Sequence, residues 1–584
     1  MGLQPPFVLL DDARPGGAPA RLYRNPVEIV RADAIADLPA ALERLRAGRA
    51  SGLHAAGYLT YDAAAGFEPK AEALVGAPPC LWFGLFEKHE IVAPADLLPD
   101  PAGAWAGPPL PAIARARYEA QFARVAALIA AGDIYQANLT FRAEVKTAGA
   151  PQALYALLRG RAAAGYGGLI ATGEQWLLSF SPELFFALEG GRLTARPMKG
   201  TAVRDADPER DRVAAQALAA DPKQRAENLM IVDLMRNDLA RVARPGSVAV
   251  PQLFEVEHYP TVHQMVSTVT ATLADGLDAV DALAALFPCG SITGAPKLRA
   301  MQVVAEVEDD ARGIYTGAIG RIDADGDAMF NVAIRTLALR GGVATLGLGS
   351  GVVADSSAGE EWAECLAKGA FVTAGETPFD LIETMRFDAE TGIALLERHL
   401  ARLKASAEAL GFTFDRHEAR NELQAATFRL RESAKVRLLL ARSGALAIGV
   451  APLPETPSLA QVAIVRHQVA PDDFRLAHKT SRRGFYDRAR AASGAFEVLF
   501  ADAEGYLTEG SFTSLFVERG GVLVTPPLAR GLLPGVLRAE LLDTGRAVEG
   551  DLTPADLGHG FFLGNAVRGL VAAVTVANQG APAL

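Results

Sequence analysis

The sequence has 584 residues, of which 50% are hydrophobic and 21% are charged. A single hydrophobic core usually stops growing at about 250–300 residues, so this length predicts two or three globular domains with little disorder outside linkers. The formal net charge is −11, and acidic and basic residues are interspersed without a basic block. The chain therefore offers no basic surface on which nucleic acid or an anionic membrane would bind.

The cysteines and the length of the apolar runs indicate in which cellular compartment the protein works. Cys80, Cys289 and Cys365 are scattered without metal-ligand spacing, and the first residues do not resemble a signal peptide. No run of about 18 apolar residues occurs, so we expect no membrane span. A reducing, cytoplasmic setting is the prediction.

Two Pro/Gly-rich stretches punctuate the chain, DPAGAWAGPPLP at 100–111 and GAFVTAGETP at 369–378. The second stretch predicts a domain boundary, which gives one domain at 1–372 and another at 378–584. The first stretch is interpreted as a division inside the first domain, between a strand-rich N-terminal part at 1–110 and a catalytic part at 111–372.

Alternation and helix signals indicate the elements of the first domain. From Tyr135 to Arg142 the residues alternate as in a half-buried strand, with Tyr135 on the same face as Ala137. The run 263–273 alternates in the same way. After it, Pro296 suits the first position of a helix, whose N-terminus would attract an anion.

Lys199 is the strongest catalytic candidate in this domain. It lies in RPMKGT at 196–201, sixteen positions after Glu183 of the stretch SPE. A lysine amine is nucleophilic only when it is unprotonated, so its usual pKa of ~10.4 must fall by roughly three units through burial or a nearby cation. A lone Lys-Gly pair is otherwise a surface turn. The pairing with Glu183 predicts a nucleophile and its acid in a pocket.

A series of motifs over about residues 110–372 resembles the chorismate-binding enzymes. The stretches are GDIYQANLT from Gly132, SPELFF from Ser181, RPMKGT from Arg196, ENLMIVDLMRNDLARV from Glu227, SITGAPK from Ser291, GIYTGAIG from Gly313 and GSGVVADS from Gly349. The resemblance implies a two-sheet α/β sandwich with the site between its sheets. In this family lysine at position 199 is typical of aminodeoxychorismate synthases, whereas anthranilate synthases typically carry alanine there, so para amination of chorismate is implied.

Glutamates indicate a metal. Glu361 and Glu364 are three residues apart after a predicted cap at Ser356 or Ser357, and so share one helix face, while Glu227 opens another amphipathic segment. Carboxylate oxygens suit Mg²⁺. By resemblance these residues would hold Mg²⁺ against a carboxylate of chorismate. Gln224 stands where relatives usually have an acidic residue that supports the metal through a water molecule. The affinity for Mg²⁺ therefore depends on this position.

The same resemblance assigns further roles. His263 would lie near the leaving hydroxyl of the substrate and take part in catalysis. A buried arginine can bind a carboxylate through two hydrogen bonds, in bidentate geometry, and Arg335 is predicted to bind a substrate carboxylate in this way. The predicted substrate-binding residues are Tyr315, Arg335, Gly349, Gly351, Lys368 and Thr293.

Residues 378–584 contain a second series, which resembles the class IV, fold-type IV enzymes that use pyridoxal phosphate. The stretches are FDLIETM from Phe379, LERHLARLKASAEALGF from Leu396, HKTSRR from His478, LTEGSFTSLF from Leu507, PPLARGLLPGVLR from Pro526 and GNAVRG from Gly564. The whole chain is thus predicted to be a multidomain protein of the α+β or α/β class. Aminodeoxychorismate lyase is the functional match within this class that the partner domain favours.

The roles in the second domain follow from the cofactor's chemistry. An amine must bond to pyridoxal phosphate, a carboxylate should meet its pyridine nitrogen, and backbone amides with a cation should hold its phosphate. Lys479, Glu509 and Arg402 fit these roles in turn, and Thr384 matches a position that assists proton transfer in lyases. The backbone amides would come from Val536 and Leu537; Leu537 replaces a threonine common in relatives, and Ser514 replaces an asparagine.

Together the resemblances imply conversion of chorismate and ammonia to 4-amino-4-deoxychorismate, then to 4-aminobenzoate and pyruvate, in folate precursor synthesis. None of the cysteines lies in a glutaminase-like context, so ammonia is expected from a separate glutamine amidotransferase subunit. A homodimer through the second domain is implied by resemblance. Two alternatives remain: an anthranilate-type synthase joined to a branched-chain or D-amino-acid-like aminotransferase, and a fusion with one inactive domain.

Overall fold

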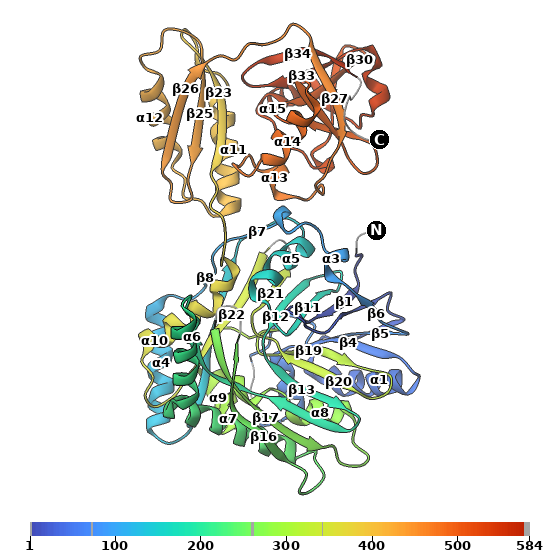
Figure 1. Ribbon diagram of the computed structural model, residues 1–584, viewed down its shortest axis with the longest axis vertical. Helices are drawn as coiled ribbons and strands as arrows, with labels where there is room; N and C mark the ends of the chain where they lie inside the picture. Colours follow the sequence, from blue (N-terminus) through green and yellow to red (C-terminus); the bar gives the residue numbers. More distant parts are fainter. Residues whose placement is uncertain (1–2, 72–73, 259–261, 341–342, 577–584) are drawn as a thin grey trace. The chain divides into compact units, whose positions relative to one another are not determined.

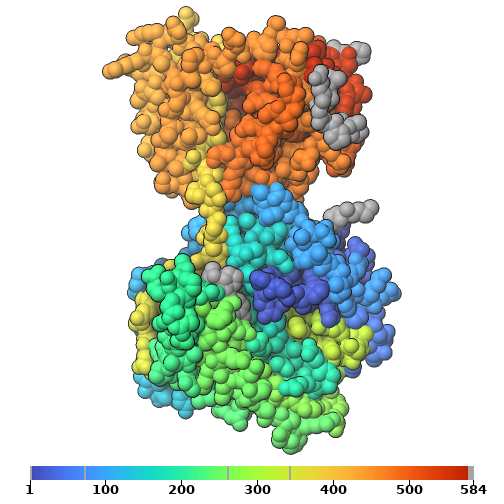
Figure 2. Space-filling view, viewed as in Figure 1, coloured from blue at the N-terminus to red at the C-terminus, as the bar shows by residue number. Residues whose placement is uncertain are grey.

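The computed structural model describes residues 3–71, 74–258, 262–340 and 343–576 (Figure 1). The chain divides into two compact units, one of residues 1–98, 108–145 and 155–374 and the other of residues 99–107, 146–154 and 375–584. In Figure 2 the first unit runs from blue to yellow and the bulk of the second from orange to red. The domain limits drawn from sequence stay a prediction. In the described part of the chain no helix is both long and apolar enough to span a bilayer.

Within the described residues of the first unit, two antiparallel sheets of ten strands each form the fold, as the predicted two-sheet fold requires. One sheet has the order β18 (Gly294–Ala295), β9 (Gln136–Val145), β22 (Val343–Val352), β21 (Thr336–Arg340), β12 (Trp176–Ser181), β11 (Tyr166–Ala171), β1 (Phe7–Asp11), β2 (Ala20–Arg24) and β6 (Glu90–Val92), with β8 (Leu110–Pro111) beside β9. The other has β15 (Met198–Val203), β17 (Val262–Thr272), β14 (Arg192–Arg196), β13 (Leu184–Glu189), β20 (Ala328–Val332), β19 (Ala318–Ile322), β4 (His54–Leu59), β5 (Leu81–Phe86) and β3 (Glu28–Ala32), with β16 (Ala249–His258) beside β17.

Three helices of this unit test the predicted helix signals. Helix α10 (Ala358–Gly369) has Ser357 as its cap, whose hydroxyl accepts a hydrogen bond from the Glu360 amide, so one of the two predicted caps is confirmed. Helix α9 (Lys297–Val307) begins one residue later than predicted, because Pro296 keeps an extended backbone at the cap position. Helix α7 (Pro222–Ala240) is capped by the Asp221 carboxylate, so the prediction that Glu227 opens this segment is wrong and Glu227 lies inside the helix.

The strand predicted from Tyr135 is only partly right. Strand β9 begins at Gln136, and Tyr135 is 69% exposed, so its predicted place in the strand on the face of Ala137 is wrong. Along β9 the residues from Gln136 to Phe141 are all buried, because the strand lies inside a sheet with β18 on one side and β22 on the other. Such a strand lacks the simple alternation of a half-exposed one.

In its described residues the second unit contains a four-stranded and an eight-stranded sheet, besides a two-stranded one. The four-stranded sheet has the order β24 (Gly392–Ile393), β23 (Leu381–Asp388), β25 (Ala434–Leu440) and β26 (Leu446–Pro452). The larger has β29 (Leu507–Gly510), β28 (Glu497–Ala501), β27 (Ala460–Arg466), β34 (Gly569–Thr575), β33 (Phe561–Asn565), β30 (Ser514–Arg519), β31 (Val522–Thr525) and β32 (Ala547–Glu549), and β27 runs parallel to both its neighbours. Its main helices are α11 (Leu396–Leu410), α12 (Arg416–Thr427), α14 (Gly484–Ser493) and α15 (Val536–Asp543).

A segment from the first half of the sequence completes the core of this second unit. Strand β7 (Trp105–Ala106) pairs with β10 (Thr147–Ala148), and Trp105 is 1% exposed among the apolar residues of the four-stranded sheet and α11. Its indole Nε1 donates a hydrogen bond of 2.6 Å to Glu376, and the Arg442 guanidinium lies 5.0 Å from its ring centroid. Trp105 is therefore part of the folded second unit.

Replacing Trp105 by alanine is expected to lower the free energy of unfolding of the second unit by about 3–5 kcal/mol, the usual cost of removing a buried tryptophan side chain. Urea unfolding combined with limited proteolysis measures which unit opens first. Trp362→Ala is the matched control, because Trp362 stacks on Phe141 inside the first unit at 4.9 Å. If Trp105→Ala left the unfolding of the second unit unchanged, the segment would contribute nothing to that core.

Candidate active sites

Most of the residues predicted for the first domain line one cavity of about 500 Å³. Its walls come from β15, β22, α7 and α10, together with the turn that precedes β13. The predicted residues on its surface are Lys199, Glu183, Tyr315, Arg335, Gly349, Gly351, Lys368, Glu227, Glu361 and Glu364. Arg335 has a φ of 49°, a left-handed backbone that is costly for a residue other than glycine and that is found most often at functional sites.

Lys199 presents its amine to this cavity from β15. A Cβ atom on Gly351 of β22 would lie only 3.0 Å from Lys199 Nζ, so the bare backbone of that glycine leaves room for the amine. Burial lowers the pKa of Lys199, and the positive charge of Lys368 lowers it further. Both effects favour the neutral amine, which is the nucleophilic form.

Glu183 provides a proton donor in the same cavity. Its side chain is buried and its Oε1 accepts a hydrogen bond of 2.7 Å from the Ser291 hydroxyl. Burial raises the pKa of Glu183 to about 7, although Ser291 and Lys199 act in the opposite direction. A carboxyl group with this pKa is half protonated at neutral pH and is suited to general acid catalysis.

Three carboxylates from two helices form the acidic side of the cavity. Glu364 pairs with Lys368 at 2.7 Å, and Glu361 accepts a hydrogen bond from the Ser356 hydroxyl. Burial raises the pKa of Glu227, and the charges of Glu364 and Glu361 add to the rise. Repulsion among neighbouring carboxylates is relieved by a cation, and an all-oxygen donor set with room for water fits Mg²⁺. Gln224 lies on the same wall but contributes no charge.

Two predicted residues are not brought to this cavity. Strand β17 turns Gln264 toward the cavity, so the next side chain, His263, lies on the other face of the sheet. There His263 Nε2 contacts Asp211 at 2.8 Å and Nδ1 contacts His258 at 2.7 Å. Thr293 is fully buried and donates its hydroxyl to the Gly290 carbonyl at 3.1 Å, which fixes the turn that carries Ser291.

A second cavity, of about 480 Å³, lies in the second unit and collects every side chain predicted for that domain. Lys479 is partly buried in the wall of this cavity. Burial, together with the positive charge of Arg402, lowers the pKa of Lys479 to about 7. The predicted residues lining the cavity are Lys479, Glu509, Arg402, Thr384, Val536 and Leu537.

Glu509 is held from two sides. The Tyr486 hydroxyl donates to its Oε1, and the Leu533 amide donates to its Oε2 at 3.1 Å. Burial raises the pKa of Glu509 to about 7, against the effect of the Tyr486 hydrogen bond. Tyr486 was not found by sequence reasoning, because its place on α14, 23 residues before Glu509, carries no motif signal.

Arg402 shares a buried carboxylate with a histidine. Glu383 of β23 accepts hydrogen bonds from Arg402 Nε at 2.9 Å and Nη2 at 2.6 Å, and from His399 Nδ1 at 2.6 Å. Burial alone would raise the pKa of Glu383, but Arg402 and His399 hold it at about 2. Arg402 Nη1 also donates to the Pro534 carbonyl at 3.1 Å, which links α11 to the turn before α15.

The remainder of the second cavity is strongly basic. Two acidic residues, Asp487 and Glu509, face a larger number of cations across it. This charge balance favours a ligand with several negative charges, such as a phosphate together with carboxylates. The additional cationic lining residues are Lys435, Arg437, Arg475, Arg483, Arg490 and Arg568.

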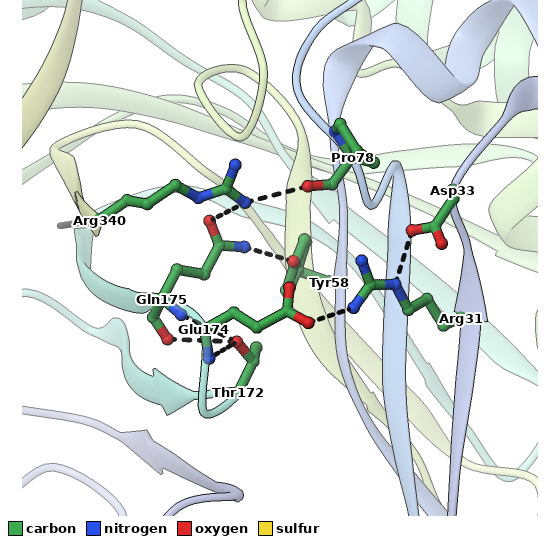
Figure 3. A network of polar contacts seen from close by, with 8 residues as sticks. All are labelled: Arg31, Asp33, Tyr58, Pro78, Thr172, Glu174, Gln175 and Arg340. Carbon is green, nitrogen blue, oxygen red and sulfur yellow. Dashed lines mark hydrogen bonds and ion pairs between the residues drawn. The ribbon is translucent and has the colours of Figure 1, made fainter.

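The first unit has another cavity, of about 390 Å³, that shares Tyr315 with the Lys199 cavity. Polar groups on its wall bond to one another: Gln175 Nε2 donates to the Tyr58 hydroxyl at 2.5 Å, and Arg340 donates to Gln175 Oε1 at 3.2 Å and to the Pro78 carbonyl at 2.9 Å (Figure 3). Lys199 and Glu183 do not line it. We therefore place the chemistry of this unit in the Lys199 cavity.

Among the described residues, His54, His89 and Asp323 bring three ligand atoms within 4.8 Å of one another. Asp323 already pairs with Arg21 at 3.2 Å and with Arg321. Two guanidinium groups at the same carboxylate oppose a further cation. We assign no metal to this cluster.

Comparison with known proteins identifies the families of the two parts of the chain. The family model for chorismate binding enzymes matches residues 12–374, and the model for class IV aminotransferases matches residues 380–576. Because the first match covers more than half of the sequence, the chain belongs to the chorismate binding enzymes. It carries a class IV aminotransferase domain in addition.

The relatives of the first domain include two kinds of enzyme. The chain is 45% identical over 256 residues to aminodeoxychorismate synthase component 1 of Klebsiella aerogenes, which covers 44% of this chain and 57% of that protein. It is 41% identical over 257 residues to anthranilate synthase component 1 of Streptomyces coelicolor, covering 44% of this chain and 50% of that protein. The chain thus spans about half the length of these curated relatives. The solved structure of anthranilate synthase component I from Streptococcus pneumoniae matches with a TM-score of 0.53 at 26% identity, over 64% of this chain and 93% of that one.

Proposed function

We propose that the first domain aminates chorismate to 4-amino-4-deoxychorismate. The observation that carries this proposal is the partly buried Lys199 amine, with its lowered pKa, in a cavity that also contains Glu183. Overall identity does not separate the aminodeoxychorismate and anthranilate synthases among the relatives, which lie at 45% and 41%. Lys199 favours the first kind, because the neutral amine supplies a nucleophile that alanine would lack.

The proposed reaction uses both residues. Lys199 Nζ attacks C2 of chorismate, the ring double bonds shift, and the 4-hydroxyl leaves as water with a proton from Glu183. Ammonia then attacks C4, the double bonds shift back, and the lysine is expelled from C2. Arg335 and Lys368, with the backbone of Gly349, would hold the carboxylates in place.

A magnesium ion would be held by Glu227 and Glu364, with Glu361 beside them. When bound, it would neutralise the substrate carboxylate and fix its orientation. Glu364 would exchange its ion pair with Lys368 for the metal, which would leave the Lys368 ammonium for the substrate.

For the second domain we propose release of pyruvate from aminodeoxychorismate, which yields 4-aminobenzoate. Pyridoxal phosphate would be bonded by Lys479, met at its pyridine nitrogen by Glu509 and held at its phosphate by Arg402 and the Val536 and Leu537 amides. The cofactor would withdraw electrons from the substrate's amino group and acidify the adjacent C–H bond. Lys479 would then carry the proton whose loss allows pyruvate to leave and the ring to become aromatic.

A class IV aminotransferase is the second candidate for this domain, since fold alone does not fix the reaction. The basic lining of the cavity supports the lyase, because its substrate brings two carboxylates in addition to the cofactor phosphate. The partner domain supports it as well, because it would supply this substrate.

Ammonia is proposed to come from a separate amidotransferase subunit. The cysteines of the chain are all buried, and burial raises the pKa of Cys289 to about 12 and those of Cys80 and Cys365 to about 11. A thiol of this kind is not the thiolate nucleophile that glutamine hydrolysis requires. A cytoplasmic location and a dimer through the second domain complete the proposal.

The first half-reaction is tested with cofactor-free protein, chorismate, ammonium and Mg²⁺, and with products separated by chromatography. Aminodeoxychorismate is expected with ammonium and none with glutamine alone. Anthranilate as the product would overturn the assignment that rests on Lys199, and equal rates with glutamine and ammonium would overturn the separate ammonia source.

The pH dependence of this half-reaction should report Glu183. Above a pKa of about 7 the carboxyl group loses the proton that it must donate, so the rate should fall about tenfold for each pH unit beyond that value. Protonation of Lys199 acts in the opposite direction, because only its neutral amine is nucleophilic. Initial rates between pH 6 and 9, at a constant concentration of free ammonia, measure the profile, and Glu183→Gln should remove its alkaline decline.

A further inference from the structure

His399 lines the second cavity with one ring nitrogen for which the described residues supply no hydrogen-bond partner. The side chain is 1% exposed and lines the cavity, with Nδ1 bonded to Glu383 at 2.6 Å. Its other nitrogen, Nε2, is buried and makes no hydrogen bond to any residue that the structure describes. A buried polar atom without a partner costs roughly 1–3 kcal/mol, so a ligand that bonds to it is favoured.

The position of His399 relates it to Arg402. The two residues lie three apart on α11 and therefore on one face of the helix, and both bond to the same Glu383 carboxylate. Arg402 is in turn bonded to Pro534, next to the turn that opens α15. An anion bound by Arg402 at this turn would lie within the cavity region that His399 lines.

The chemistry of the ring suits an anion. With Nδ1–H donated to Glu383, a neutral ring has a lone pair at Nε2, and a protonated ring has a donor there. The charged groups that act on the ring are Glu383, Arg402 and Lys479, and burial with the two cations lowers the pKa of His399. A phosphate dianion would reverse this balance, because its charge stabilises the protonated ring.

We propose that His399 binds the phosphate of the cofactor through Nε2, beside Arg402, with Glu383 orienting both side chains. This inference rests on the proposed use of pyridoxal phosphate by the second domain. It adds His399 to the phosphate site, although the motif resemblance assigned no role to this residue.

The test compares two ligands that differ only in the phosphate. Cofactor-free full-length protein is titrated with pyridoxal phosphate and with pyridoxal, and binding is followed by the change in ligand absorbance. His399→Phe should weaken pyridoxal phosphate binding about 10- to 100-fold, the usual range for one charge-assisted hydrogen bond, and change pyridoxal binding less than about twofold. The ³¹P resonance of the bound cofactor should also shift in His399→Gln, which keeps a donor and should retain part of the affinity.

His478→Phe is the matched control. His478 lines the same cavity but bonds to Ser406 at 3.0 Å and does not contact Glu383, so its loss should affect both ligands equally. Equal weakening of both ligands by His399→Phe would overturn the inference and make His399 a packing residue. Unchanged affinities with an unchanged ³¹P resonance would overturn it too. Wild-type protein that binds neither ligand would instead contradict the proposed cofactor.

Discussion

Replacing Lys199 by alanine should lower the rate of aminodeoxychorismate formation by about three orders of magnitude, because the reaction then loses its covalent route. The side chain is partly buried in the cavity wall, and its pKa is lowered by burial and by Lys368, which favours the neutral amine that the reaction needs. Direct attack of ammonia on chorismate accounts for the activity that remains. Chromatographic rates with saturating chorismate and ammonium measure the loss.

The control for Lys199→Ala is the second half-reaction of the same protein. Release of pyruvate from supplied aminodeoxychorismate should proceed at the wild-type rate, which shows that the variant is folded. Lys199→Arg should be as slow as the alanine variant, since a guanidinium stays protonated at all accessible pH values. A wild-type rate of aminodeoxychorismate formation in either variant would remove the nucleophilic role of Lys199.

Lys479→Ala has the largest expected effect in the second domain. A pKa of about 7 leaves half of the Lys479 amines neutral at pH 7, whereas an ordinary lysine with a pKa of ~10.4 has fewer than about one in a thousand. Loss of this amine should abolish 4-aminobenzoate formation, so that aminodeoxychorismate accumulates from chorismate at the wild-type rate. Product analysis over time measures both quantities.

Reduction with borohydride gives an independent readout for Lys479. In wild-type protein, reduction should attach the cofactor to the peptide that contains Lys479, and in Lys479→Ala no attachment to that peptide should occur. Attachment to a different lysine in the wild-type protein would contradict the assignment. Continued 4-aminobenzoate formation by the alanine variant would show that this amine is not needed.

Much of both sites could be predicted from sequence because they are carried by contiguous motifs. RPMKGT and SPELFF place Lys199 and Glu183 in one cavity, and HKTSRR with LTEGSFTSLF does the same for Lys479 and Glu509. Short stretches of this kind fix the backbone locally, and the chemistry of their side chains can be inferred from the sequence before the fold is known.

The failures concern information that a linear pattern does not contain. His263 and Gln264 alternate on β17, and only the placement of that strand in its sheet decides which of them meets the cavity. Tyr135 lies just before the strand that its alternation predicted, and is exposed. In both cases tertiary packing decides the outcome.

Residues that act on a functional group from a distant part of the sequence were also missed. Tyr486 bonds to Glu509 across 23 positions, and Trp105 enters the core of the second unit from the other side of the predicted boundary. Glu383 belongs to a recognised motif, yet its bonds to His399 and Arg402 appear only in the folded chain. Contacts between elements that are far apart in sequence leave no periodic signal.

We propose that one chain carries chorismate through to 4-aminobenzoate. The most direct test is product analysis after purified full-length protein is incubated with chorismate, ammonium, Mg²⁺ and pyridoxal phosphate. We expect 4-aminobenzoate and pyruvate in equal amounts. Anthranilate in place of 4-aminobenzoate, or aminodeoxychorismate that accumulates without pyruvate from the second site, would contradict it.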